Sequence, residues 1–510
     1  MTLGRTKSVA VNGIDGRVVQ VESDVSSGLP AFVITGMPDT ACRQSPERIR
    51  AAFANSELQL PKQHITVNLS PAALPKHGSG FDLAIAIAVL ISAKVVDATL
   101  AREVVHLGEL GLDGSIRSVT GVLPAVVAAA EAGVPQVVVP MANAAEASLV
   151  PDVEVIPMAS LADLARRYDL LRRHQPVPEP DLPAPQYRQE QHGPDLADVA
   201  GQEEARHAIE VAAAGGHHMA MVGPPGVGKT MIAERLAGLL PLLDRREALE
   251  VTAIHSVLGA LTDDVLVERP PFVAPHHGTT MAAVVGGGSG NVRPGAASRA
   301  HRGVLFLDEA PEFKRDVLDA LRQPLESGFI EVARARGTVR YPAVFQLVLA
   351  ANPCPCGRNY GKGASCTCSP VLRRGYLSKL SGPLLDRVDV HLQMHPVTRL
   401  TLAGSKGEST ATVAERVLAA RRRQEARWKH SRWRLNSQVP GPVLRRGEWM
   451  LPGAVTRDLS LALETGALTL RGYDRCLRLA WTVADLRGVE RPGPDELGEA
   501  LCLRTSQVAA

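Results

Sequence analysis

The stretch GPPGVGKT, residues 223–230, decides the fold of the chain around it. It fills the pattern G-x-x-x-x-G-K-[ST], in which glycines let the backbone turn its N–H groups toward the phosphates of a nucleotide. Lys229 is expected to reach the β- and γ-phosphates, and the Thr230 hydroxyl to ligate Mg²⁺. The alternative is a chance glycine-rich turn. The flanks disfavour it, because MAMVG (219–223) is typical of a buried strand and TMIAERLAGLL (230–240) has the apolar spacing of a helix.

ATP hydrolysis needs a second, acidic element, and GVLFLDE (303–309) supplies it. Its apolar residues predict a buried strand that ends at Asp308 and Glu309. We expect Asp308 to hold Mg²⁺ through water and Glu309 to act as general base on the attacking water. A strand ending in a polar turn is the alternative, and the position downstream of the phosphate loop favours the site. The residues expected around ATP and Mg²⁺ are Gly223, Pro224, Pro225, Gly226, Val227, Gly228, Lys229, Thr230 and Asp308.

Two further polar residues, one at the end of a predicted strand and one just outside the core, are candidates for the site. Asn352 ends the apolar run LVLAAN, where its side chain can orient water against the γ-phosphate; the alternative is an Asn-Pro turn without nucleotide contact. Arg387, in LSGPLLDRVDVHL, can reach the γ-phosphate of a neighbouring subunit as an arginine finger. The alternative for Arg387 is a surface salt bridge to Asp386 or Asp389.

The segment LTLRGYDRCLRLAWTVADL, residues 468–486, predicts an amphipathic helix with Arg471 near its start. An arginine there can touch the nucleotide from a lid, and Arg475, one turn on, is the rival candidate. The alternative is a solvated arginine row that includes Arg478.

The composition is that of a globular protein. At 510 residues the chain can hold two to four domains of about 100–200 residues each. A net charge of +3 is too small to indicate nucleic acid by itself. Because no window holds about 18 uninterrupted apolar residues and the N-terminus lacks a signal-peptide core, we expect a cytoplasmic protein without a membrane partner. Seven cysteines in such a chain do not suggest a disulfide framework.

Proline-rich and glycine-rich stretches divide the chain. HQPVPEPDLPAPQYRQEQHGPD (174–195) predicts an extended linker, and TLAGSKGEST (401–410) predicts a second boundary. Beyond it the sequence carries helical periodicity and little strand signal. The expected parts are an N-terminal domain at 1–172, a linker at 173–194, a nucleotide-binding core at 195–400 and a helical C-terminal lid at 401–510.

Four cysteines lie close together in the sequence CPCGRNYGKGASCTC. Four thiolates can bind a structural Zn²⁺ tetrahedrally, although the C-x-C-x₉-C-x-C spacing departs from the usual gaps. The alternative is four reduced thiols with a structural or incidental role. The candidate zinc ligands are Cys354, Cys356, Cys366 and Cys368.

Two segments are candidates for contact with DNA. Residues 413–436 carry eight Lys/Arg against two Glu, with Trp428 and Trp433 between them, which suits phosphate contacts and base stacking. The alternative is a solvated helix face in the lid. The second candidate is the glycine-rich stretch 275–295, which includes His276, His277 and Arg293.

These features together resemble the AAA+ ATPases, and more narrowly the magnesium-chelatase-like branch that includes the YifB/ComM proteins. The matching stretches are DLADVAGQEEARHAIEVAAAGGHHMAMVGPPGVGKT, APHHGTTMAAVVGGGSGNVRPGAASRAHRGVLFLDEAPEF, ANPCPCG and SGPLLDRVD. The resemblance runs over nearly the whole chain. It implies an α/β fold: an AAA+ P-loop core with a parallel sheet and a helical lid, working as hexameric rings, with segment 275–295 directed into the ring pore. The family's nucleotide roles carry over to Lys229, Thr230, Asp308, Glu309, Asn352, Arg387 and Arg471.

The N-terminal part resembles the proteolytic domain of Lon and the matching domain of RadA, through VNLSPAALPKHGSGFDLAIAIAVL (67–90) and the stretch 106–140. This implies an α+β domain of the Lon-protease-like, ribosomal S5 domain 2-like kind. Peptidase activity is not expected, because Gly80 stands at the nucleophile's place, Ser79 is one residue early and the lysine partner falls on Pro124. We expect a retained fold that assembles the ring or contacts DNA.

The resemblance favours an ATP-driven motor on branched or single-stranded DNA, linked to branch migration in homologous recombination and to transformation, with recombination proteins as partners. The alternative is a protein-remodelling or metal-insertion subunit like that of magnesium chelatase. That subunit lacks the Lon-like domain, which favours the DNA hypothesis. A third hypothesis, a regulator that uses ATP only as a switch, is disfavoured by the intact Asp308–Glu309 pair.

Overall fold

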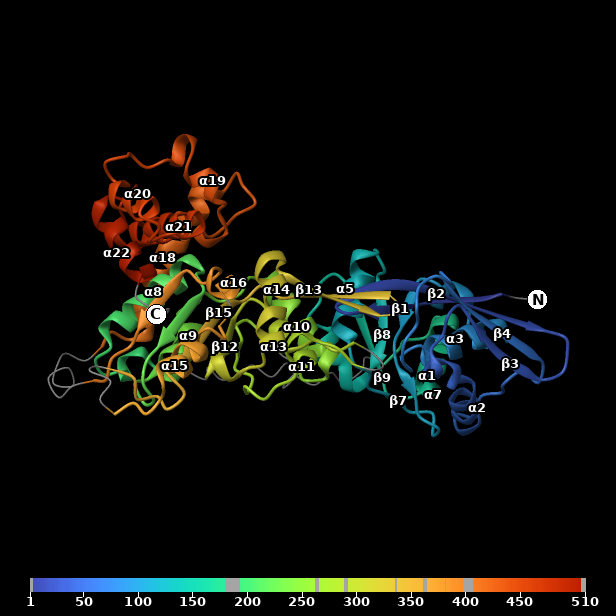
Figure 1. Ribbon diagram of the computed structural model, residues 1–510. Coiled ribbons are helices and arrows are strands. Elements are labelled where there is room, and N and C mark those ends of the chain that lie inside the picture. Colours follow the sequence, from blue (N-terminus) through green and yellow to red (C-terminus); the bar gives the residue numbers. More distant parts are fainter. Residues whose placement is uncertain are drawn as a thin grey trace.

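The computed structural model describes residues 3–178, 193–261, 266–288, 292–334, 337–360, 365–380, 382–397 and 407–505. Figure 1 shows two sheet-containing units side by side, with a group of helices from the C-terminal part of the chain standing over the second unit. None of the described helices combines the length and the apolar character needed to cross a membrane.

The first unit is built on a mixed seven-stranded sheet. Its strand order is β3-β4-β2-β1-β5-β8-β9, with β2 antiparallel to both of its neighbours and the other pairs parallel. The strands are β1 (Gly4–Asn12), β2 (Asp15–Ser26), β3 (Ala31–Thr35), β4 (His64–Ser70), β5 (Val104–His106), β8 (Gln136–Pro140) and β9 (Glu154–Met158). A short hairpin is formed by β6 (Glu109–Leu110) and β7 (Ile116–Arg117).

Two apolar helices cover opposite faces of this sheet. Alternate residues of a strand point to opposite faces, and accordingly Ala10 and Val19 pack with α3 (Asp82–Ser92), whereas Val9 packs with α5 (Val122–Glu131). Every residue of α3 is buried, as its continuous apolar sequence predicts. The remaining helices of the unit are α1 (Thr40–Arg43), α2 (Ser45–Asn55), α4 (Ala98–Ala101), η1 (Met141–Asn143), α6 (Ala144–Ala147) and α7 (Leu161–Arg172).

The second unit contains an entirely parallel five-stranded sheet, which confirms the parallel sheet expected from the sequence. Its order is β11-β12-β15-β10-β16. Strands β10, β12 and β15 are buried along their whole length, as parallel strands covered on both faces must be. The strands are β10 (Met219–Val222), β11 (Phe272–Val273), β12 (Val304–Leu307), β15 (Gln346–Ala351) and β16 (Val390–Gln393).

Helices cover both faces of the parallel sheet. Phe306 and Val348 pack on the side of α8 and α9, and Leu305 and Leu347 pack on the side of α12 and α13. The helices of this unit are η2 (Leu196–Asp198), α8 (Glu203–Gly215), α9 (Lys229–Leu239), α10 (Arg245–Leu258), α11 (Met281–Val285), α12 (Ala296–Arg299), η3 (Ala310–Glu312), α13 (Arg315–Ala320), α14 (Arg322–Ser327), α15 (Pro370–Leu377) and α16 (Gly382–Leu385).

A hairpin and a helix join the two units. The hairpin of β13 (Phe329–Arg334) and β14 (Gly337–Pro342) lies beside the end of β1, where Asn12 Nδ2 donates to the Thr338 carbonyl over 3.3 Å (Figure 1). The next residue, Gly13, has a positive φ, and a Cβ there would lie 2.7 Å from the Arg340 carbonyl oxygen. Helix α10 packs against α5. The two units therefore share a contact surface.

The C-terminal helices form the group that stands over the parallel sheet. They are α18 (Thr410–Trp428), η4 (Asn436–Gln438), α19 (Gly441–Leu444), η5 (Gly447–Trp449), α20 (Arg457–Glu464), α21 (Leu470–Arg487) and α22 (Pro494–Thr505). Helices α18 and α21 pack on α8, and α22 packs on β16. Trp428 and Trp481 are buried between these helices.

Part of the basic segment 413–436 serves this packing. Arg421 donates two hydrogen bonds to the Ala213 carbonyl, at 3.0 and 2.6 Å, and Arg427 pairs with the buried Asp485. Trp428 is only 3% exposed. Burial leaves Trp428 no exposed ring for base stacking, whereas contact of the exposed basic side chains of this segment with DNA stays a prediction.

Two predicted domain boundaries fall on residues that the structure does not describe. The linker at 173–194 lies outside the described residues from 179 to 192, and the boundary between 400 and 401 lies within 398–406, which is also outside them. The domain limits stay predictions, as does the kinship of the first unit with the Lon proteolytic domain.

Candidate active site

The phosphate loop connects β10 to α9 at the carboxyl edge of the parallel sheet. Gly226 and Gly228 have φ values of 79° and 94°, a left-handed conformation that glycine adopts without strain. Helix α9 begins at Lys229 without a side-chain cap, so its first N–H groups remain available to an anion. The loop therefore has the backbone form that the sequence pattern predicts for a phosphate site.

Lys229 lies at the centre of this loop. Its Nζ donates to the carbonyl oxygens of Gly223 and Pro224, at 2.6 and 3.0 Å, and to Asn352 Oδ1 at 3.0 Å. Burial lowers the pKa of the amine, and the charges of Asp308 and Glu309 oppose that shift. The amine thus joins the phosphate loop to the end of β15, as expected if Asn352 faces the γ-phosphate.

Thr230 and Asp308 supply the oxygen atoms for a hard cation. The Thr230 hydroxyl donates to Asp308 Oδ2 over 3.0 Å, and Asp308 Oδ1 accepts from the Glu309 N–H at 2.9 Å. Hydroxyl and carboxylate oxygens are the ligands that Mg²⁺ prefers. Two predicted magnesium ligands, one in the first turn of α9 and one at the end of β12, therefore lie in direct contact.

Glu309 has a strained backbone and an unexpected partner. Its φ of 50° is uncommon for a residue with a Cβ, and such strain gathers at functional positions. Its carboxylate lies 3.3 Å from His277 Nδ1. His277 belongs to the segment 275–295 that we expected to face DNA, of which 289–291 lie outside the described residues. Nothing in the sequence around His277 indicates that this histidine meets the candidate general base.

Gln202 is a second residue that the sequence analysis missed. Its Nε2 donates to the Val227 carbonyl at 3.1 Å and to the His395 carbonyl at 2.8 Å. It therefore ties the phosphate loop to the segment after β16. Gln202 lies just before α8 in a left-handed conformation with φ of 54°, which the sequence does not reveal.

Arg387 and Arg471 lie in a cluster of positive charge. Arg387 donates to the Pro383 carbonyl at 2.5 Å and pairs with Glu326, so its counter-ion is neither of the aspartates considered from the sequence. Burial lowers the pKa of Arg387, and Arg322 and Arg471 lower it further. Arg471 is 74% exposed in its side chain and lies 3.8 Å from Asp386. The cluster suits an anion brought by a neighbouring molecule.

The rival candidates in the same helix have structural partners. Arg475 pairs with Asp389, which is 2% exposed, and Asp389 also accepts from His217 Nδ1 at 3.1 Å. Arg478 donates to the Val439 carbonyl at 2.7 Å. Arg475 thus holds α21 at the start of β16, and Arg478 holds it to the segment between η4 and α19. This leaves Arg471 as the exposed arginine of the predicted row.

Three family models match the chain. The model described as "Magnesium chelatase, subunit ChlI" matches residues 195–402, "Subunit ChlI of Mg-chelatase" matches 21–143, and "Magnesium chelatase, subunit ChlI C-terminal" matches 407–504. An "Uncharacterized protein" of Mycobacterium tuberculosis is 50% identical over 99% of both chains. The "Uncharacterized protein YifB" of Escherichia coli is 39% identical over 99% of this chain and 97% of its own, and "Competence protein ComM" of Haemophilus influenzae is 38% identical over 99% and 98%. The chain belongs to the magnesium-chelatase-like YifB/ComM family.

Membership of this magnesium-chelatase-like family indicates an AAA+ type ATPase that uses ATP and Mg²⁺. The contacts around Lys229, Thr230 and Asp308 fit both ligands. The name of the Haemophilus relative connects that protein with competence.

The four cysteines of this YifB/ComM-family chain form a compact cluster. Their sulfur atoms all lie within 4.8 Å of one another. Cys354 Sγ is 3.4 Å from Cys356 Sγ, and Cys366 Sγ is 3.7 Å from each of them. The arrangement is compatible with a bound zinc ion.

The first unit has no arrangement for a Lon-type dyad among its described residues. Ser79 Oγ donates to the Glu109 carboxylate rather than to an amine. Lys76 is fully buried, and its Nζ donates to the Leu69 carbonyl at 2.8 Å and to the Pro71 carbonyl. Pro124 lies within α5. None of these contacts gives Ser79 a lysine partner, and the absence of peptidase activity stays a prediction.

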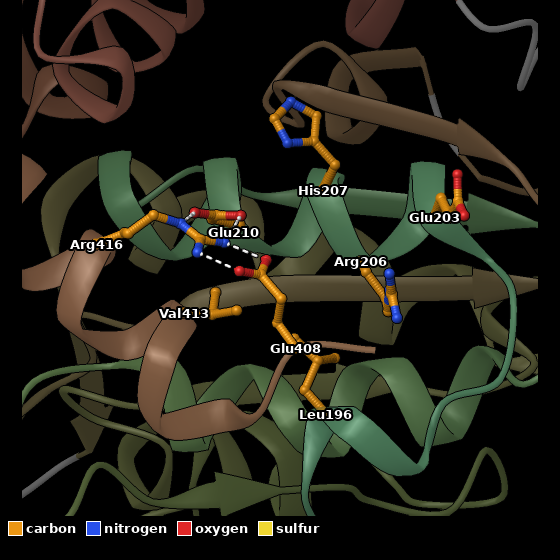
Figure 2. Close-up of a pocket in the computed structure, with 8 residues that line it drawn as sticks. All are labelled: Leu196, Glu203, Arg206, His207, Glu210, Glu408, Val413 and Arg416. Atoms are coloured by element: carbon orange, nitrogen blue, oxygen red, sulfur yellow. Dashed lines mark hydrogen bonds and ion pairs between the residues drawn. The ribbon is translucent and has the colours of Figure 1, made fainter. Parts of the chain in front are cut away.

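A separate pocket of about 250 Å³ lies between α8 and α18. Figure 2 shows Arg416 of α18 between two carboxylates, Glu210 and Glu408, each 2.7 Å from a guanidinium nitrogen. No residue of the phosphate loop lines it. The full lining is Leu196, Glu203, Arg206, His207, Glu210, Glu408, Val413 and Arg416. Its ion pair between Arg416 and Glu210 connects α18 to α8, and none of the residues expected around ATP lines the pocket.

Proposed function

We propose that this protein is an ATP-hydrolysing motor that works as a homo-oligomeric ring, a hexamer, on branched or single-stranded DNA and drives branch migration. The observation that supports it most is the meeting of the phosphate loop with the ends of two strands, β15 and β12. Lys229 contacts Asn352, and Thr230 contacts Asp308, next to Glu309. The full-length similarity to a competence protein supports DNA as the substrate and recombination proteins as partners.

The proposed chemistry assigns one task to each side chain. Lys229 and the loop N–H groups bind the β- and γ-phosphates, and Thr230 and Asp308 hold Mg²⁺, which neutralises phosphate charge. Asn352 orients the attacking water. Glu309 accepts a proton from that water as its oxygen attacks the γ-phosphorus and the bond to the ADP oxygen breaks.

A neighbouring subunit completes the site in this proposal. Arg387 and Arg471 belong to a positively charged cluster, and Arg471 is exposed. An arginine supplied by the next subunit neutralises charge that develops on the transferred phosphoryl group. Hydrolysis thereby depends on ring assembly. The lid, formed by α18 to α22, then changes position with the nucleotide state and moves the DNA.

The DNA contacts are assigned to basic groups that remain exposed. In the segment 413–436 these include Arg422, Lys429 and Arg432. Phosphate contacts by such side chains give binding that weakens strongly with salt. The glycine-rich stretch around Arg293 is the second candidate contact.

The test is the ATPase rate with and without a synthetic four-way DNA junction, with junction movement scored in the same tubes. We expect the junction to stimulate hydrolysis and to be moved by the wild-type protein. The Lys229→Ala variant should show no DNA-stimulated hydrolysis and should not move the junction. The Glu309→Gln variant should bind the junction without moving it. An ATPase rate that no DNA affects would reject the DNA motor.

The second candidate function is a remodelling ATPase that acts on a partner protein, as in metal insertion. Its support is that all three matching family models are described as a magnesium chelatase subunit. The same assay separates the two functions. A DNA-indifferent ATPase that is stimulated by a co-purified protein partner would favour remodelling.

A further inference from the structure

The cysteine cluster is assembled from two places in the chain. Cys354 and Cys356 follow the end of β15, and Cys366 and Cys368 precede the start of α15. Residues 361–364 between the pairs lie outside the described part of the chain, whereas all four sulfur atoms are within it. A group that binds all four sulfurs therefore fixes the end of a sheet strand to the beginning of a helix.

The spacing of the sulfur atoms fits one tetrahedral metal ion. With a Zn–S bond of about 2.3 Å, the sulfurs of a tetrahedral site lie about 3.8 Å apart. The distances among the sulfurs of Cys354, Cys356 and Cys366 are 3.4, 3.7 and 3.7 Å. A disulfide needs about 2.05 Å, and none of the seven cysteines, all of which lie in the described residues, forms a disulfide. A cluster of several irons would hold the sulfurs further apart.

Backbone amides support the sulfur atoms. The N–H groups of Arg358 and Thr367 hydrogen-bond to the Cys356 sulfur, and the N–H of Asn359 bonds to the Cys354 sulfur. Such second-shell donors orient metal ligands and stabilise the thiolate form that binds a metal. Both halves of the loop supply them, so the amides surround the cluster from two sides.

The cluster also touches the candidate active site. Gly357, in the turn after the first cysteine pair, has a φ of 72°, and a Cβ there would lie 2.6 Å from the Pro225 ring. The turn thus lies directly against the phosphate loop. Asn352, two residues before Cys354, accepts the hydrogen bond from Lys229.

On its other side the cluster leads into α15. Tyr376 of this helix is buried and hydrogen-bonds to Glu312, which follows the acidic pair by one short turn. Lys379 Nζ lies 3.9 Å from Glu312. The two chain segments that the cysteines join therefore contact two parts of the site, one the phosphate loop and the other Glu312, three residues after Glu309.

We propose that Cys354, Cys356, Cys366 and Cys368 bind one structural zinc ion, which clamps the end of β15 and the start of α15 together and so holds Asn352 and the Gly357 turn against the phosphate loop. The zinc has four protein ligands and no open position, so it takes no part in the chemistry. Its effect on nucleotide binding rests on the proposed ATPase function, whereas its presence does not.

The test uses the full-length protein purified without chelator. Elemental analysis should give one zinc per chain and no stoichiometric iron. The Cys366→Ser variant should lose the metal, and Cys502→Ser, which changes an exposed cysteine on α22, should retain it. Cys366→His keeps a ligand that zinc accepts and should restore the metal. Zinc below about a fifth of an equivalent in the wild type, or full retention in Cys366→Ser, would overturn the zinc site.

The clamp is tested by the affinity for a fluorescent ATP analogue in the same variants. The metal-free variant should bind about tenfold more weakly, which corresponds to about 1.4 kcal/mol of lost preorganisation. Circular dichroism confirms that each variant is folded, and the His variant should recover affinity together with zinc. Unchanged affinity in a folded, zinc-free variant would overturn the clamp. A wild-type protein that holds zinc but binds no ATP would instead reject the proposed function and leave the zinc site standing.

Discussion

The buried pair of Asp389 and Arg475 gives a quantitative test of how the lid is held on the sheet. Asp389 follows α16 at the start of β16 and is 2% exposed, while Arg475 comes from α21 with its side chain 14% exposed. Replacing Arg475 with alanine leaves a buried carboxylate with His217 as its remaining side-chain partner. Removing one member of a buried pair costs about 3–5 kcal/mol, and we expect about 3 because His217 stays.

Thermal unfolding followed by circular dichroism measures this effect. A loss of about 3 kcal/mol lowers the melting temperature of a unit of this size by roughly 6–12 °C. Arg471→Ala is the matched control, because Arg471 lies one turn earlier on the same helix but is exposed and 3.8 Å from its carboxylate. That exposed pair should change stability by less than about 0.5 kcal/mol. Equal melting temperatures for the two variants would refute the assignment of Arg475 to packing.

The pH dependence follows from the same pair. Burial by itself would raise the pKa of Asp389, but Arg475 and His217 outweigh it and hold this pKa well below its ordinary value. A carboxyl group with a depressed folded pKa stabilises the protein above its unfolded pKa, which is about 3.9, and that stability is lost as the pH falls below it. The difference between wild type and Arg475→Ala should therefore be full at pH 6–7 and should shrink below about pH 4.

Three further predictions concern the candidate site and the DNA contact. Glu309→Gln should abolish ATP turnover and preserve binding of a fluorescent ATP analogue, whereas Lys229→Ala should lose that binding. ATP turnover by Glu309→Gln would reject the role of Glu309 as general base. Arg387→Ala should lower hydrolysis by about 10³-fold with an unchanged oligomer in size-exclusion chromatography, and a normal rate would reject the finger. Arg422→Glu should weaken DNA binding without a change in melting temperature. Arg421→Glu should instead unfold the C-terminal helices, because burial lowers the Arg421 pKa to about 10 and its guanidinium donates to the Ala213 carbonyl. Equal DNA affinity for Arg422→Glu and wild type would exclude the exposed face of α18 as a DNA contact.

Local patterns in the sequence predicted the elements that carry the phosphate loop. The apolar runs before Gly223, Asp308 and Asn352 are strands β10, β12 and β15, and the helix expected after the loop is α9. Each of these depends on a short stretch whose hydrophobicity and end residue are visible in the sequence. The contact between Lys229 and Asn352 could be anticipated as well, because parallel strands present their carboxyl ends at one edge of the sheet.

The partners of charged side chains could not be predicted in the same way. Arg475 and Asp389 are far apart in the chain, and nothing in either segment distinguishes a buried arginine from an exposed one. The basic helix illustrates the same limit: Arg421 and Arg422 are neighbours in sequence, yet one bonds to a core carbonyl and the other faces solvent. Burial of a charged group depends on the helix's rotation against its neighbour, which the charge pattern does not encode.

The candidate catalytic charges are all paired within the single chain, and this bears on how hydrolysis would be controlled. The Lys229 amine is occupied by loop carbonyls, Glu309 lies beside His277, and Arg387 pairs with Glu326. A phosphate that reaches the loop must replace the carbonyls at Lys229, and a finger that reaches a neighbour must leave Glu326. Each step exchanges one polar partner of a charged side chain for another. Its free-energy cost is small only when the new partner, the phosphate or the neighbouring subunit, is present. Under the proposed function, the isolated subunit is therefore a resting form, and nucleotide and neighbouring subunit have to arrive together before Glu309 and Arg387 are free to act.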